Sequence, residues 1–201
     1  MDVCYFCGDE ANSDEHAPPK SFFPKGMREN LITVRSCPKH NNDKSKDDEY
    51  VRLFVVGTLD PAVSTNEKVQ STAIRGVVRK HALGFKMLNN AEVVNGEIAV
   101  DFDYSRFESF FDSLARAIYF HHFGSSLSTD IDLYIFKLRF ADLDFGLQDF
   151  LRIKENECRI RFDGLEKHGS NQEVFYYQVS YDEKALKLVL YDSFIVYVTL
   201  S

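Results

Sequence analysis

Two pairs of metal-binding residues near the N-terminus constrain the fold of this chain more than any other feature. Cys4 and Cys7 are spaced C-x2-C, and Cys37 and His40 are spaced C-x2-H. Ligands at this spacing fit one tight turn, so both side chains of a pair can reach the same ion. Thiolates combined with an imidazole favour zinc over magnesium or calcium. The spacing therefore predicts a tetrahedral, structural zinc site made by these residues.

A second set of polar residues lies between the two pairs and just after them. It comprises Asp14, Glu15, His16, Asn30 and Asn41. A closed zinc site has no positions left for these side chains. An imidazole titrates near neutrality, so His16 can serve as a general base. From the spacing alone, the segment holds a titratable histidine inside a loop framed by a metal site.

This segment resembles the zinc-knuckle branch of the HNH endonucleases. It reads C-x2-C, Glu-His-x-Pro-Pro-Lys, Asn-Leu and C-x2-H-Asn-Asn-x-Lys, in that order. The resemblance covers about a quarter of the chain and implies a treble-clef-like ββα-metal module, in which a β-hairpin and a helix surround a catalytic metal. The fourth zinc position is usually Cys in this branch and is His40 here. The last catalytic position, often His in the family, is Asn41, which the family also uses.

The resemblance implies a metal-dependent endonuclease that hydrolyses DNA phosphodiester bonds. His16 would be the general base that deprotonates the attacking water. Glu15 and Asn41 would hold the catalytic divalent cation, and their oxygen ligands favour Mg²⁺ or Mn²⁺. Asn30 would hold the loop or form a hydrogen bond to the imidazole. Structural zinc and a catalytic Mg²⁺ or Mn²⁺ are therefore the expected cofactors.

The adjacency of Glu15 and His16 is difficult to reconcile with a shared site. Successive residues of a strand point to opposite faces, so both reach one metal only if the backbone twists or bulges. Asp14 shares a face with His16 and is the fallback carboxylate, or it orients the imidazole. We favour Glu15, because the family places the acid directly before the histidine.

Basic residues that could contact DNA are few. The formal net charge is −7, whereas affinity for nucleic acid comes mainly from Lys and Arg on phosphates. A local basic patch can suffice, and Lys44 and Lys20 are the expected contacts. A basic helix expected at residues 67–81 is a second candidate surface, although we favour an ordinary solvated face there. An acidic surface would also suit a partner protein that supplies the DNA contact.

Composition and cysteine usage indicate the compartment. The chain of 201 residues has no signal-peptide pattern at its N-terminus and no apolar run long enough to span a membrane. Cys158 is the one cysteine outside the metal pattern, which suits a reducing cytosol better than a disulfide scaffold. We therefore expect a cytoplasmic protein with no membrane partner.

The rest of the chain predicts an α+β domain with a long helix on an antiparallel sheet. We expect the metal module at residues 1–56 and this domain, of unassigned role, at 57–201, because residues 57–66 are rich in turn formers. The clearest helix is Asp103–Phe123, capped by Asp103 or Ser105 and ended by Gly124. Its apolar stripe consists of Phe107, Phe110, Phe111, Leu114, Ile118 and His121.

Alternating apolar residues predict the strands of this domain. The expected strands are 97–102, 132–140, 157–162, 173–181 and 186–200, the last folded into a hairpin at Asp192-Ser193. Residues 143–153 could form a short helix. No internal repeat or low-complexity tract is present.

Two other functions remain open at this point. The zinc fold could be a non-catalytic scaffold that binds protein or nucleic acid. The nuclease could also be a toxin kept silent by a regulatory partner protein, and the second domain could instead form a homodimer. By analogy, a stand-alone nuclease of this size suggests bacterial or phage defence.

Overall fold

The computed structural model describes most of the chain, with gaps. The described residues are 3–42, 45–57, 92–94, 97–99, 103–136 and 145–200. Lys44, the expected basic helix at 67–81 and the end of the strand expected at 132–140 lie outside them. Within these ranges the fold is mixed α+β with antiparallel sheets, as expected.

A short hairpin and two helices make up the N-terminal segment. Strand β1 (Ser13–His16) pairs antiparallel with β2 (Thr33–Ser36). The 3-10 helix η1 (Lys20–Phe22) lies in the connection between them. Helix α1 (Pro38–Asn42) begins just after β2, and α2 (Ser45–Gly57) follows. The hairpin thus precedes the helices in the chain, and the specific treble-clef ββα-metal module stays a prediction.

The C-terminal part is built on a four-stranded antiparallel sheet in the order β5-β8-β7-β6. The strands are β5 (Ile131–Ile135), β6 (Phe175–Val179), β7 (Ala185–Leu190) and β8 (Phe194–Leu200). The hairpin expected at 186–200 is confirmed, because β7 and β8 pair around the turn at Tyr191–Ser193. A separate hairpin joins β3 (Glu92–Val94) to β4 (Glu97–Ala99).

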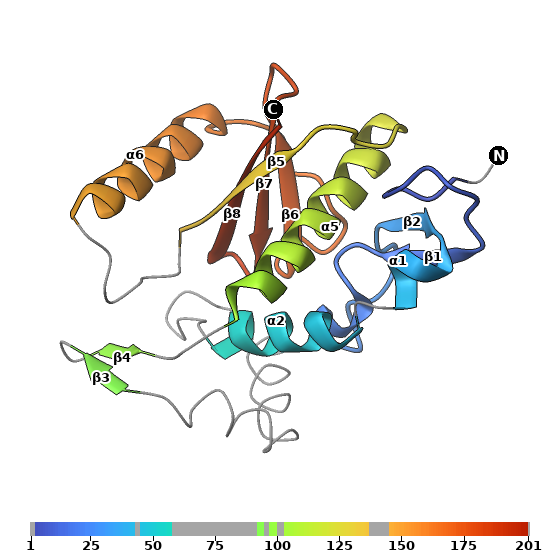
Figure 1. The fold of residues 1–201 in the computed structure, drawn as a ribbon, viewed down its shortest axis with the longest axis horizontal. Coiled ribbons are helices and arrows are strands. Elements are labelled where there is room, and N and C mark those ends of the chain that lie inside the picture. The colour runs from blue at the N-terminus through green and yellow to red at the C-terminus, as the bar shows by residue number, and fades with distance from the viewer. Residues whose placement is uncertain are drawn as a thin grey trace.

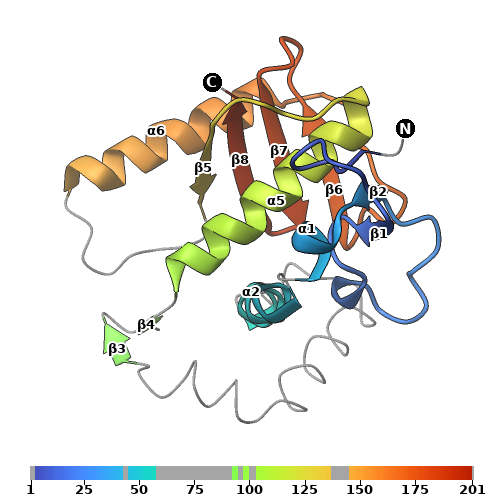
Figure 2. The same ribbon diagram turned by 45° about the vertical axis from the view of Figure 1, so that its right-hand side comes forward.

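Helices cover both faces of this sheet. Helix α5 (Tyr104–Phe123) crosses one face and α6 (Phe145–Arg161) covers the other (Figures 1 and 2). Alternation along β8 explains the arrangement, since Phe194, Val196 and Val198 join the core under α5. Tyr197 points the opposite way and packs with residues of α6. Successive residues of β8 thus pack alternately into the apolar layer under α5 and the apolar layer under α6.

The long helix agrees with its sequence pattern. Its predicted apolar stripe is buried, except for His121, which is exposed. Gly124 ends the helix with a φ of 72°, a left-handed conformation that glycine adopts without steric cost. Asp103 occupies the N-cap position, but its carboxylate accepts a hydrogen bond from the Ser105 hydroxyl instead of capping the helix.

The strand expected at residues 157–162 is wrong, because these residues belong to the end of α6 and the turn after it. Alternation of apolar residues suggested a strand. In the helix, Cys158 and Phe162 are four residues apart and both are buried against the sheet. Ile160, which a strand would have placed beside them, is 63% exposed. Residues 145–153 of the expected short helix form the first half of α6.

One apolar core runs from the N-terminal segment to the sheet. It contains Tyr5, Val51, Phe111 and Leu188, among others. An ion pair of 2.6 Å between Arg106 and Asp47 also joins α5 to α2. The expected boundary between residues 56 and 57 stays a prediction. No helix in the described ranges combines the length and apolarity that crossing a membrane would require.

Candidate functional site

The four predicted zinc ligands converge on one point. The ligand atoms of Cys4, Cys7, Cys37 and His40 all lie within 4.8 Å of one another. Cys37 Sγ is 3.2 Å from His40 Nδ1, and Cys4 Sγ is 3.7 Å from the same nitrogen. The Sγ atoms of Cys7 and Cys37 are 3.9 Å apart, and the cysteines are free thiols.

These distances fit zinc. A tetrahedral zinc with bonds of about 2.3 Å to sulfur and about 2.0 Å to nitrogen holds its ligand atoms roughly 3.5–3.8 Å apart. The three separations of 3.2, 3.7 and 3.9 Å surround this range. The cluster can therefore bind a metal ion such as zinc with only small movements of the side chains.

Local backbone geometry aims each pair of ligands inward. In the first turn, the Gly8 N–H donates to the Cys4 carbonyl at 2.9 Å, and Gly8 has a φ of 77° that favours glycine. In the second, the N–H groups of His40 and Asn41 both donate to the Cys37 carbonyl at 3.1 Å. The helical start of α1 thus brings Cys37 and His40 to the same side.

The electrostatics of the cluster favour a thiolate at Cys4. Burial opposes its ionisation, but N–H groups of Cys7, Cys37 and Phe6 donate to its sulfur and lower its pKa to about 6. Burial of its sulfur, helped by side-chain hydrogen bonds with Asp9 and Cys4, raises the pKa of the neighbouring Cys7 thiol. A bound cation would compensate both charges, which is the usual role of zinc among cysteines.

A small cavity lies beside the end of β1. Glu15, His16 and Asp48 line it together with residues of α5, and its volume of about 10 Å³ is enough for one water molecule. Glu15 and His16 therefore border one space despite their adjacency. Asp48, in the first turn of α2, was not among the expected site residues.

The two faces of β1 hold different partners. On one face, Glu15 accepts a hydrogen bond of 3.3 Å from the Tyr5 hydroxyl. On the other, His16 Nδ1 lies 3.1 Å from the Thr33 hydroxyl. Asp14 shares that face but pairs with Arg35 at 2.8 Å. Thr33, rather than Asp14, is therefore the residue that orients the imidazole.

The contact with Thr33 is compatible with the tautomer of His16 that a general base needs. The Thr33 hydroxyl has one proton, which it donates to the Leu31 carbonyl at 3.1 Å. In this arrangement the Thr33 oxygen accepts from His16 when the imidazole carries its proton on Nδ1. The lone pair is then on Nε2, where a general base needs it.

The remaining expected residues lie in three places. Asn41 Nδ2 donates to the Ser13 hydroxyl at 2.9 Å, and Ser13 shares the Glu15 face of β1. The Asn30 carbonyl accepts from the Ser170 hydroxyl at 2.8 Å, so this residue ties its loop to the C-terminal part. Lys20 is exposed at the start of η1. Asn41 and Asn30 do not line the cavity beside Glu15.

Comparison of the chain with protein families, with curated proteins and with solved structures gives no match.

Proposed function

We propose that this protein is a metal-dependent HNH-type endonuclease that hydrolyses DNA, with a structural zinc held by Cys4, Cys7, Cys37 and His40. The observation that carries the proposal is the state of His16. Its Nδ1 lies 3.1 Å from the Thr33 hydroxyl, and in the tautomer with the proton on Nδ1 the Nε2 lone pair is left to accept a proton. This imidazole lies within a hairpin framed by the zinc ligands, as the resemblance implies.

The donors near His16 suit a hard divalent cation. Glu15 would supply a carboxylate, and Asn41, which lies outside the cavity and donates through its amide nitrogen to Ser13, would have to offer its amide oxygen from there. Asp48 borders the same cavity as Glu15 and adds a second carboxylate. Bound Mg²⁺ or Mn²⁺ would stabilise charge on the phosphate and on the leaving oxygen. His16 removes the proton from the water, and Thr33 holds the ring in place.

The size of the cavity favours a second candidate function. A space of about 10 Å³ beside Glu15 admits a water molecule but not a phosphate. A zinc scaffold that binds protein or nucleic acid without catalysis would need no larger opening. The two candidates differ in one respect: only the nuclease depends on the imidazole of His16.

A plasmid-cleavage assay separates them. We expect cleavage by the purified protein with Mg²⁺ or Mn²⁺ but not with EDTA, and a loss of about a hundredfold or more in His16→Ala. The His121→Ala variant, which removes an exposed histidine of α5, is the matched control. Zinc content should be unchanged in both variants. Equal cleavage by wild type and His16→Ala, or no cleavage by either, rejects the nuclease.

Thr33 provides a finer test of the same site. The Thr33→Val variant keeps the shape of the side chain but removes the acceptor for His16 Nδ1. We expect a moderate loss of cleavage with a shifted pH profile, and recovery in Thr33→Ser. A purely structural role for Thr33 would lower stability without moving the pH profile.

A further inference from the structure

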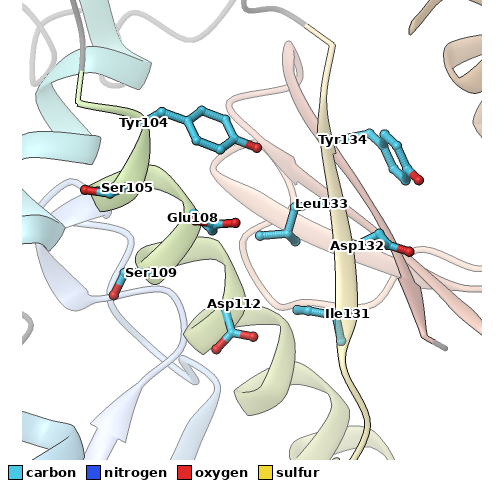
Figure 3. A pocket seen from close by; sticks show the side chains of 9 residues that line it. All are labelled: Tyr104, Ser105, Glu108, Ser109, Asp112, Ile131, Asp132, Leu133 and Tyr134. Atoms are coloured by element: carbon cyan, nitrogen blue, oxygen red, sulfur yellow. The ribbon is translucent and has the colours of Figure 1, made fainter. Parts of the chain in front are cut away.

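Strand β5 leaves one edge of the sheet open. It is the first strand in the order β5-β8-β7-β6, so in the described part of the chain β8 is its only neighbour. A groove of about 530 Å³ lies beside it, bordered on the other side by the first half of α5 (Figure 3). This volume is within the range of ligand sites, roughly 300–1,000 Å³.

The groove follows the strand edge rather than a face of the sheet. Its lining includes the consecutive residues Ile131, Asp132, Leu133 and Tyr134. In Figure 3, Ile131 and Leu133 point toward α5, whereas Asp132 and Tyr134 point away. Side chains on both faces of a strand can border one groove only at the edge. The edge presents unpaired N–H and C=O groups of alternate residues to an incoming chain.

The charge of the groove is negative. Glu108 and Asp112 line it from α5 and Asp132 lines it from β5, and no Lys or Arg is among its described lining residues. Arg116 pairs with Asp112 at 3.0 Å but also donates to the Leu127 carbonyl. Glu108 is exposed to the groove and has no such counter-ion in its lining.

We propose that this groove binds an extended, basic peptide segment of another protein, which adds a strand to the free edge of β5. Main-chain hydrogen bonds to β5 would supply part of the affinity. Lysine or arginine side chains on the α5 side would meet Glu108 and Asp112. The five residues of β5 accommodate a segment of similar length, about 17 Å.

Charge distinguishes this occupant from two others. A second copy of the chain would bring the same carboxylates to the edge, and the net charge of −7 adds to the repulsion. A nucleic acid would place phosphates against Glu108 and Asp132. A cationic peptide is attracted by every ionisable side chain of the groove except the tyrosines, which it can contact through their ring faces.

Titration of the full chain with a defined peptide tests the proposal. The probe is a capped peptide of about eight residues that alternates lysine and valine, long enough to span β5. Binding is measured by calorimetry, and backbone amide chemical shifts locate it. We expect shifts centred on Ile131–Ile135. A glutamate–valine peptide and a lysine–valine peptide N-methylated at alternate residues serve as controls, and neither should bind.

Charge variants complete the test. We expect Glu108→Gln combined with Asp132→Asn to weaken binding about tenfold, since the double variant removes two partly exposed charge pairs. Asp149→Asn, a matched change on the exposed surface of α6, should leave binding unchanged. Thermal unfolding of each variant confirms that it is folded.

Four results would overturn the proposal: no binding of the lysine–valine peptide, equal binding of its N-methylated form, equal binding to the double variant, or amide shifts away from β5. Dimerisation that Asp132→Lys abolishes would also overturn it, because a second copy would then occupy the edge. None of these measurements depends on nuclease activity, so this proposal and the proposed function can fail separately.

Discussion

The hydroxyl of Tyr191 donates a hydrogen bond of 2.8 Å to the backbone carbonyl of Phe22. Tyr191 lies in the turn between β7 and β8, and Phe22 ends η1 in the loop between the two pairs of zinc ligands. Both side chains are buried, and their rings stack at 6.5 Å. The metal-framed loop is therefore anchored on the far end of the chain.

Removing this hydroxyl should destabilise the whole protein. In Tyr191→Phe the buried Phe22 carbonyl loses its donor, which should cost about 1–2 kcal/mol in the free energy of unfolding. Urea denaturation measures this cost. The control Tyr181→Phe changes a side chain that is 89% exposed, and it should shift stability by less than about 0.5 kcal/mol. Equal stability of both variants would show that the Tyr191 contact contributes nothing.

Stability should fall at alkaline pH because of the same residue. Burial raises the pKa of Tyr191, and the charge of Arg52 opposes this only in part. Above about pH 10 the unfolded chain loses the tyrosine proton while the folded chain keeps it, so rising pH favours unfolding. The expected slope from one such group is about 1.4 kcal/mol per pH unit. Tyr191→Phe should therefore show a shallower decline than wild type above about pH 10.

Zinc should bind in a one-to-one ratio and stabilise the N-terminal segment. Cys37→Ser removes a ligand atom that lies 3.2 Å from His40 Nδ1, so the protein should purify without the metal and unfold at a lower temperature. Cys158→Ser is the matched control, because Cys158 lies on the face of α6 that is buried against the sheet, outside the cluster. Elemental analysis and calorimetry give both quantities. A metal-free wild type that melts like the zinc-loaded protein would contradict the expectation.

The contact between α5 and the sheet should dominate core stability. Phe111 is fully buried and stacks on Phe194 with ring centroids 5.8 Å apart. Phe111→Ala should cost about 3–5 kcal/mol, from the lost burial and the cavity left behind. Ile160→Ala, at a helix position 63% exposed, should change stability by less than about 0.5 kcal/mol. Similar losses in both variants would mean that α5 is not the main support of the sheet.

Sequence patterns that fit only one local structure could be predicted from the sequence alone. The spacing of Cys4, Cys7, Cys37 and His40 leaves little choice but a shared ion, and the ligand atoms do converge. The stripe of α5 was equally clear, because its residues recur at helical spacing over about four turns and Gly124 marks the end.

Where a sequence pattern fits two local structures, contacts with residues far away in the chain determine which one forms. The spacing of Cys158, Ile160 and Phe162 fits either a strand or a helix. The helix and the turn after it form because they let both Cys158 and Phe162 pack against the sheet. The same holds at the candidate site, where Thr33 rather than Asp14 meets His16, and Asp48 joins Glu15. The pairing of β1 with β2 and the packing of α2 bring these groups together.

The sequence by itself determined which four residues could bind a metal ion and which face of the long helix is buried. Only the tertiary structure decided that residues 145–161 form one helix, how His16 is oriented, and that no described strand pairs with the outer edge of β5. The physical reason is that spacing limits where a side chain can point, whereas the surface packed against it determines which direction has the lower free energy.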